Sequence, residues 1–275
     1  MRRILSLNEI DVLKEYSDPE VNARLNANRH LCCKIEGRAY MLAIHYFDVR
    51  RAVKKDEKIY IYCSDQDLIY VCDNKRCIQL AKSIDEKLSN FRQLVEFFFA
   101  MTDDDVYELE NIENKITGVE DELLTEINVK NTPQKIISLR RELLRMKRYY
   151  EQFSLITSEL AEDDGNIIPD EVQNRYHVFD RRIDHLLNSV MHLREYTTQV
   201  REAYQARIDI EQNQIMKIFT VISAIFLPLM LIVGWYGMNL KMPEYGWRFG
   251  YLFVMALSVV ALLVCLAVLK KKKWF

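Results

Sequence analysis

Residues 215–239 read IMKIFTVISAIFLPLMLIVGWYGMN, and a second apolar run, GYLFVMALSVVALLVCLAVL, follows at residues 250–269. The first run has one charged residue, Lys217, and the second has none. A helix needs roughly 20 residues to cross a hydrocarbon core of about 30 Å, and each run has that length. A single such run also fits a buried core helix, but two runs joined by a short loop favour a membrane hairpin. The sequence therefore predicts two membrane spans.

Basic residues indicate how the hairpin is oriented. Two spans place both chain ends on one side of the membrane. Basic residues at the start of the first span, before it or after the second span are Arg201, Arg207, Lys217, Lys270, Lys271, Lys272 and Lys273, whereas the loop has only Lys241 and Arg248. The positive-inside rule then predicts a cell-membrane protein with both termini in the cytosol. The first residues, Met1-Arg2-Arg3, lead into a charged segment, so we expect no signal peptide.

The first ninety or so residues are predicted to form a small cytosolic α/β module. Residues 39–49 and 58–72 are rich in β-branched and aromatic side chains, and Ser64-Asp65-Gln66-Asp67 reads as a hairpin turn. Helical signals begin after Leu80 and cover residues 82–101. The following Thr102-Asp103-Asp104-Asp105 is typical of a helix start, because its oxygens can accept hydrogen bonds from the first backbone amides.

Two charged helices of opposite sign are predicted next. Residues 103–127 are acidic, residues 134–150 are basic, and Pro133 marks the turn between them. After a second turn at residues 163–169, residues 170–227 contain neither glycine nor proline. One helix of about 58 residues, about 87 Å long, can therefore run from the cytosol into the first span. Its predicted apolar stripe consists of Val178, Ile183, Leu186, Leu187, Val190, Leu193, Tyr196 and Val200.

The first span carries a mixed polar and apolar face. Steps of three and four residues give Asn213, Met216, Thr220, Ser223, Leu227, Met230 and Gly234, with Phe219 beside them. Small residues on such a face also allow close helix packing, and both roles are compatible. If the face lines a pore, no carboxylate within the span can replace the tightly held water of Mg²⁺, so the ion is expected to pass hydrated.

The loop between the spans carries the most specific motif. Tyr236-Gly237-Met238-Asn239, with residues 242–247 (MPEYGW), two C-terminal spans and a terminal lysine run, resembles the CorA family of divalent-cation channels, in the two-span Gly-x-Asn superfamily. The resemblance implies that Gly237, Met238 and Asn239 form the selectivity filter. It also implies a homopentameric funnel with a central pore, built from the α/β module, a long α-helical stalk and the transmembrane hairpin. Asn213 matches a pore asparagine, and Phe219 with Met216 and Leu227 matches an apolar gate.

The resemblance also implies regulation by Mg²⁺ bound between cytosolic domains. Candidate ligands on the stalk are Asp180 and Asp184, one helical turn apart, with Asp209 nearer the membrane. Ordinary solvated carboxylates explain these three residues equally well. Residues 270–273, four lysines, resemble the family's basic collar, and anchoring to lipid headgroups also explains them.

The predicted domains follow these signals. They are the α/β module (1–95), a helical hairpin (96–168), the stalk (169–213), the pore-lining span (214–236), an external loop (237–249), the second span (250–269) and a basic cytosolic end (270–275). The six cysteines lack zinc-site spacing and are expected to be reduced and mostly buried. The five histidines form no catalytic or metal pattern, so no enzyme is expected, and no nucleic-acid partner.

The leading interpretation is a channel that conducts hydrated Mg²⁺, with Co²⁺ and Ni²⁺ as further substrates, down the electrochemical gradient into the cytosol. Two alternatives stay open. One is a zinc transporter of the same superfamily, because neutral oxygens at a wide pore select weakly among divalent ions. The other is a membrane-anchored coiled-coil sensor or scaffold that does not conduct, although such a protein needs neither the polar face nor the Gly-Met-Asn motif.

Overall fold

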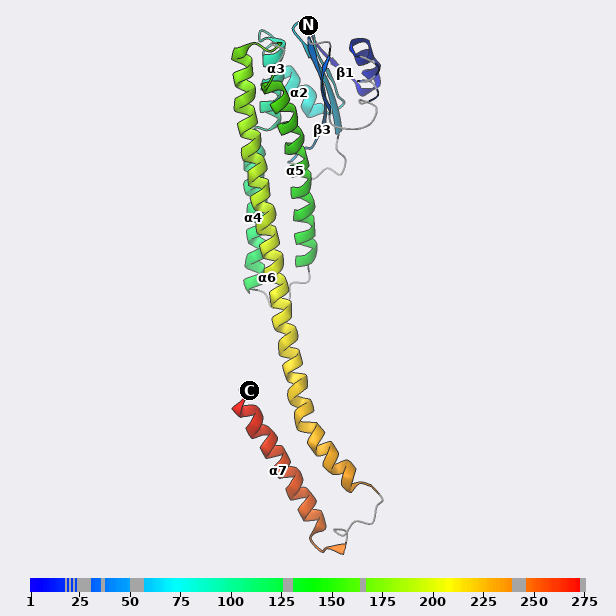
Figure 1. Ribbon diagram of the computed structural model, residues 1–275, viewed down its shortest axis with the longest axis vertical. Helices are drawn as coiled ribbons and strands as arrows, with labels where there is room; N and C mark the ends of the chain where they lie inside the picture. The colour runs from blue at the N-terminus through cyan, green and yellow to red at the C-terminus, as the bar shows by residue number, and fades with distance from the viewer. Residues whose placement is uncertain are drawn as a thin grey trace. The chain divides into compact units, whose positions relative to one another are not determined.

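The computed structural model describes residues 1–17, 19, 21, 23, 31–35, 38–49, 57–125, 131–163, 167–238 and 246–272 (Figure 1). The chain divides into two compact units, Met1–Arg201 and Glu202–Phe275. Helix α6, Asp170–Tyr236, begins in the first unit and ends in the second.

The N-terminal part of the first unit is built on a five-stranded sheet. Its strands are β1 (Arg2–Leu5), β2 (Leu31–Ile35), β3 (Ala39–Tyr46), β4 (Glu57–Ser64) and β5 (Leu68–Val71), in the order β1-β5-β4-β3-β2. Only β1 and β5 run parallel; the other neighbours are antiparallel. The β4–β5 hairpin turns at the predicted place, where the Asp67 backbone amide donates to Ser64 Oγ at 3.0 Å.

The sheet is covered on both faces, which explains why β3 is apolar along nearly its whole length. One face packs against the 3-10 helix η1 (Leu7–Tyr16), with Met41, Ile69 and Leu13 in the shared core. The other face meets the helices: the Tyr40 and Phe91 rings pack edge to face, and the Tyr70 ring lies 4.9 Å from that of Phe97. The α/β class of this module is therefore as predicted.

Two helices follow the sheet where one continuous helical segment was predicted. They are α2 (Lys75–Ser83) and α3 (Asn90–Met101), so residues 84–89 interrupt the segment. Each has a side-chain cap that the sequence analysis missed: Asn74 accepts from two backbone amides of α2, and Ser89 accepts from that of Arg92. The helix start predicted within residues 102–105 is confirmed, since the next helix begins at Asp105, while Thr102 ends α3.

Three long helices run side by side in the first unit (Figure 1). The acidic helix α4 is Asp105–Thr125, and the predicted residues 126 and 127 lie outside the described part. The basic helix α5 is Thr132–Ala161, eleven residues longer than predicted at its C-terminal end, because its last turns stay apolar and pack against the sheet and α6. Lys135 with Glu122, and Lys115 with Glu142, pair the two helices in antiparallel register.

Helix α6 buries a strict heptad stripe in this bundle. Its members are Val172, Tyr176, Phe179, Ile183, Leu186, Val190, Leu193, Thr197 and Val200. The predicted stripe has the right period, but it starts on the wrong residue: Val178 is 40% exposed, and Leu187 and Tyr196 are half-buried. Phe179 belongs to the buried stripe because its ring packs against the rings of Phe98, Phe99 and Phe153, and the sequence alone does not show that these four rings meet.

Candidate ion path

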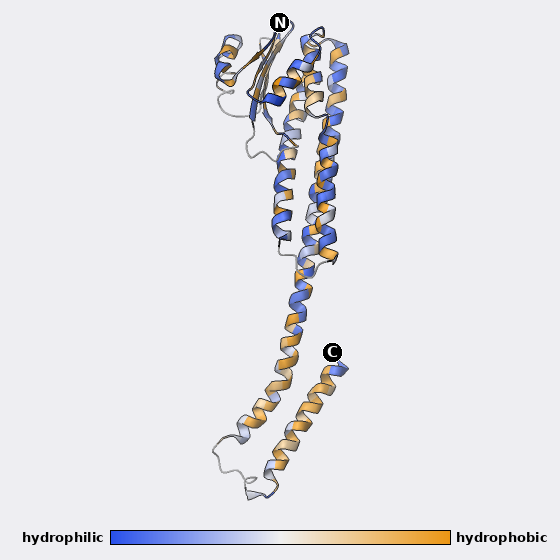
Figure 2. Ribbon diagram, turned by 180° about the vertical axis from the view of Figure 1, so that it is seen from behind, coloured by the Kyte–Doolittle hydropathy of each residue, from blue (hydrophilic) through white to orange (hydrophobic). Residues whose placement is uncertain are grey.

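Two helices of the second unit are long and apolar enough to cross a membrane: the end of α6 and α7 (Gly250–Lys271). Figure 2 shows both in hydrophobic colours, in contrast to the mixed colours of the helices in the first unit. Nearly all of this apolar surface is exposed in the single chain. Such exposure would be unfavourable in water, so these helices require lipid or further protein around them.

The eight residues predicted to line a pore are all exposed along α6: Asn213, Met216, Phe219, Thr220, Ser223, Leu227, Met230 and Gly234. The less exposed positions after residue 220 fall on a different face, which includes Val221, Ile225, Pro228 and Ile232. The chain's own packing therefore leaves the mixed face uncovered.

Two features of α6 determine which of its oxygen atoms are available to accept hydrogen bonds. The Thr220 hydroxyl donates to the Met216 carbonyl at 2.8 Å, so its proton is used and its lone pairs can accept a hydrogen bond. Pro228 lies inside the helix and has no N–H, so the carbonyl of Ala224 lacks the usual donor four residues on. Both oxygens suit a partner that donates hydrogen bonds, such as the water around a cation.

Gly237 ends the first span for a steric reason. Its backbone amide donates to the Val233 carbonyl at 2.8 Å, and a Cβ at this position would meet the same oxygen at 2.8 Å. Any other residue would displace the helix end. From the sequence, Gly237 was assigned only to the selectivity filter, although a glycine after an apolar helical run is the ordinary C-terminal signal. Met238 is half-exposed, and Asn239 lies outside the described residues, as do residues 240–245.

The C-terminal end of α7 carries the lysines predicted to form a basic collar. Lys270 and Lys271 form its last turn, where positive charge is favourable to the helix dipole, and the Lys272 backbone amide caps it. Lys273 lies outside the described residues. At the N-terminal end of α7, the rings of Trp247 and Phe253 lie 5.9 Å apart.

The three predicted regulatory aspartates differ in their surroundings. Asp180 is half-buried and accepts a hydrogen bond from the Thr157 hydroxyl of α5 at 2.8 Å. Asp184 and Asp209 are exposed. Among the described residues, no group of three or more His, Cys, Asp or Glu side chains is arranged to hold a metal ion. Burial raises the pKa of the Cys72 thiol to about 11, and Cys63 and Cys77 are also buried, so these three thiols are poor metal ligands.

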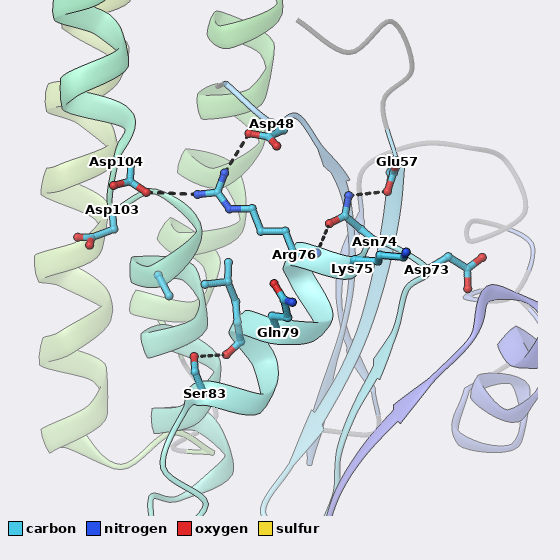
Figure 3. A pocket seen from close by; sticks show the side chains of 12 residues that line it. Asp48, Glu57, Asp73, Asn74, Lys75, Arg76, Gln79, Ser83, Asp103 and Asp104 are labelled. Atoms are coloured by element: carbon cyan, nitrogen blue, oxygen red, sulfur yellow. Dashed lines mark hydrogen bonds and ion pairs between the residues drawn. The ribbon is translucent and has the colours of Figure 1, made fainter. Parts of the chain in front are cut away.

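An acidic hollow of about 930 Å³ lies between α2 and the start of α4 (Figure 3). Arg76 at its centre binds Asp48 at 2.9 Å and Asp104 at 3.4 Å. The other carboxylates lining it also have partners: Glu57 with Asn74, Asp73 with Ser6, and Asp103 with Arg182. Each of these carboxylates thus has a hydrogen-bond or ion-pair partner, in a network that joins the sheet to the helices, but the lining stays acidic because Asn74 and Ser6 carry no charge.

Comparison with known proteins identifies the family. The family model described as "CorA-like Mg2+ transporter protein" matches residues 5–271. The chain belongs to the CorA family. This family consists of transporters rather than enzymes. CorA membership agrees with the apolar hairpin, and with the Gly-Met-Asn motif at its turn.

Two curated relatives have matching names. The Cobalt/magnesium transport protein CorA of Thermotoga maritima is 32% identical over 177 residues, which are 64% of this chain and 50% of the relative. The Magnesium transport protein CorA of Helicobacter pylori is 27% identical over 165 residues, which are 60% of this chain and 48% of the relative. The matched regions therefore span about half the length of these relatives.

Solved structures show the same fold. The complete CorA magnesium transporter from Methanocaldococcus jannaschii superposes with a TM-score of 0.79 at 21% identity, covering 98% of this chain and 87% of the other. The ZntB cytoplasmic domain from Vibrio parahaemolyticus is less similar, with a TM-score of 0.59 at 12% identity, covering 72% of this chain and 82% of the other. The predicted arrangement of α/β module, long helix and C-terminal apolar helix is confirmed.

Proposed function

We propose that the chain assembles as a homopentamer in a cell membrane and conducts hydrated Mg²⁺, and also Co²⁺ and Ni²⁺, into the cytosol. The observation that carries this proposal is the mixed polar face of α6, from Asn213 to Gly234, which the chain leaves uncovered next to a Gly-Met-Asn turn. The names of the CorA relatives support Mg²⁺ and Co²⁺ as substrates.

The oxygens on this face suit an ion that keeps its water. Mg²⁺ dehydrates reluctantly, and its first-shell waters point their hydrogens outward. Thr220 offers lone pairs because its own proton is bound to the Met216 carbonyl. The amide oxygens of Asn213 and Asn239 would accept from the same waters further along the path. At the mouth, Gly237, Met238 and Asn239 would form the filter, with the Gly237 carbonyl facing the incoming ion.

Apolar side chains on the same face provide the closed state. Met216, Phe219, Leu227 and Met230 are exposed on α6. Rings of such residues can stop conduction by expelling water from a narrow passage. A membrane potential of 100 mV, negative inside, would drive a divalent ion inward with about 4.6 kcal/mol when the passage is open.

Regulation is proposed at the cytosolic carboxylates. Intracellular Mg²⁺ bound between subunits at Asp180, Asp184 and Asp209 would hold the closed state by relieving repulsion between like charges. Asp184 and Asp209 are exposed and available for this role, whereas Asp180 would have to exchange its bond to Thr157. Lys270 to Lys273 would anchor the second span to anionic headgroups and surround the cytosolic entrance.

The decisive experiment is Mg²⁺ influx into proteoliposomes that contain a magnesium-sensitive dye. We expect influx with the wild-type protein and at least a tenfold loss with Asn239→Ala, because the filter would lose its amide oxygen. Asn174→Ala is the matched control, since Asn174 is an exposed asparagine of α6 in the first unit. Repeating the assay with Zn²⁺ and a zinc-sensitive dye distinguishes a zinc transporter from the proposed Mg²⁺ channel. Absence of influx of either ion, with internal Mg²⁺ removed, would favour a non-conducting sensor.

A further inference from the structure

Helix α4 has an outward face whose carboxylates have no charge partner in the described part of the chain. Glu110, Glu113 and Asp121 are exposed, and within the described part of the chain their carboxylates make neither a hydrogen bond nor an ion pair. The other acidic residues of the helix do have partners, such as Glu122 with Lys135 and Glu120 with Tyr196. We refer to Glu110, Glu113 and Asp121 as the acidic face of α4.

A basic and apolar groove lies between α5 and α6. Two hollows of about 840 and 640 Å³ follow these helices, and the larger is also lined by His45 of β3 and by Phe47. Arg140, Arg141 and Arg148 line them from α5, and all three are exposed without a hydrogen bond or ion pair in the described part of the chain. Leu144 and Met191, which are 38% and 43% exposed, add apolar surface from the two helices. We refer to these hollows together as the α5–α6 groove.

The acidic face and the groove lie on opposite sides of one bundle. The inner stripe of α4, which includes Ile112 and Ile116, is buried, so its acidic face points away from α5 and α6. The groove between α5 and α6 opens on the side away from α4. Three unpaired carboxylates and three unpaired guanidinium groups are therefore complementary, but they cannot meet within one chain. Contact between two different surfaces of identical chains is heterologous and closes into a ring when the rotation permits.

The register of the bundle predicts which residues would meet. Lys115 of α4 lies level with Glu142 of α5, and Glu122 lies level with Lys135. Extending this antiparallel register by six residues puts Arg148 level with Leu109, the neighbour of Glu110. The same register puts Arg141 level with Ile116, one turn from Glu113. In a ring of identical copies whose axis runs parallel to the bundle, a given residue lies at the same height along the axis in every copy. Residues that are level within one chain are therefore also level between neighbouring copies.

We propose that the acidic face of α4 in one copy docks into the α5–α6 groove of the next copy, pairing Glu110 with Arg148 and Glu113 with Arg141. The exposed Tyr107, on the same side of α4 as Glu110, would add apolar contact near Leu155 of the neighbour. Rim charges of this kind set partner orientation and register more than they set affinity. This inference rests on the ring assembly proposed above and identifies the surfaces that close the ring.

Crosslinking of the full-length protein in membranes tests the pairing. In the variant Glu110→Cys/Arg148→Cys, a short bis-maleimide should link neighbouring copies into a ladder of bands beyond the dimer, because each copy offers one residue to each neighbour. The single variants control for the six native cysteines. The pair Glu110→Cys/Ile137→Cys is the matched control: both positions are exposed on these faces, but they differ in height by about 15 Å and should crosslink at least fivefold less.

A charge exchange tests the electrostatic part. Arg148→Glu should lower crosslinking of Glu113→Cys/Arg141→Cys at least threefold, and adding Glu110→Arg should restore it. Bands that stop at the dimer would indicate an isologous contact and overturn the proposal. An intact oligomer by mass measurement, without crosslinks at Glu110 and Arg148, would also overturn it but would leave the channel proposal standing. A monomer in lipid would instead contradict the proposed function itself.

Discussion

At the residue scale, one buried carboxylate joins two residues that follow α5, Ile167 and Ile168, to the sheet. Asp163 accepts hydrogen bonds from the backbone amides of Ile167 and Ile168 at 2.6 and 2.8 Å, and from the Tyr40 hydroxyl at 2.8 Å. Lys34 of β2 binds the same carboxylate at 3.1 Å. In the sequence, Asp163 was recognised only as part of a turn. Its contacts with the sheet depend on Lys34 and Tyr40, which lie far away in the sequence.

Replacing Asp163 is expected to lower the free energy of unfolding. Asp163→Ala would leave two buried amides, a hydroxyl and an ammonium group without their acceptor, a loss of about 3 kcal/mol. The measurement is the thermal unfolding midpoint of the first unit in the full-length protein. Asp85→Ala is the control, because Asp85 is exposed and caps only a local turn. Equal midpoints for the two variants would show that the buried network contributes little.

Gly237 gives a second prediction at this scale. Gly237→Ala should reduce Mg²⁺ influx several-fold, because the new Cβ would lie 2.8 Å from the Val233 carbonyl and push the following Met238 and Asn239 out of place. Gly118→Ala serves as the control, since nothing lies within 4 Å of a Cβ added there. The control should conduct like wild type. Unchanged influx with Gly237→Ala would mean that the helix end adapts without cost to the filter.

At the element scale, helix α4 starts at Asp105, a buried carboxyl group whose ionisation is disfavoured by its burial. Asp105 is 4% exposed and accepts a hydrogen bond from the Tyr150 hydroxyl of α5 at 3.0 Å. Burial raises the pKa of this carboxyl from 3.8 to about 6, although Tyr150, Arg76 and Arg182 act in the opposite direction. The neutral acid is thus favoured in the folded state relative to the unfolded chain.

The sign of the pH effect follows from this shift. Between about pH 4 and pH 6 the folded state holds more protons than the unfolded state, so Asp105 lowers stability as pH rises through that window. Above pH 6 the loss is complete, at about 3 kcal/mol or less. Asp105→Asn keeps the acceptor for Tyr150 and should raise the unfolding midpoint at pH 7.5 but have little effect at pH 4.5. The same gain at both pH values would contradict a charge-based cause.

At the scale of the whole molecule, the orientation in the membrane determines which residues reach the cytosol. The chain has basic residues beside the two span ends that are proposed to face the cytosol, and few in the loop between the spans. We expect a membrane-impermeant maleimide added to intact cells to label Trp247→Cys but not Ser83→Cys. After cell lysis, Ser83→Cys should react as well, because Ser83 lies at the exposed end of α2. Labelling of Ser83→Cys in intact cells would reverse the proposed topology.

The sequence by itself determined the two spans, their loop motif and the period of the long helix, because hydropathy and helical spacing are local properties. It also located the sheet strands β3, β4 and β5 closely, since alternation and turn residues are local too. Only the tertiary structure decided which residues of α6 enter the bundle. Phe179 is buried and Val178 is exposed, because the position of a stripe depends on the aromatic rings of α3 and α5. Asp163 and Asp105 likewise acquire their roles from partners more than forty residues away along the chain.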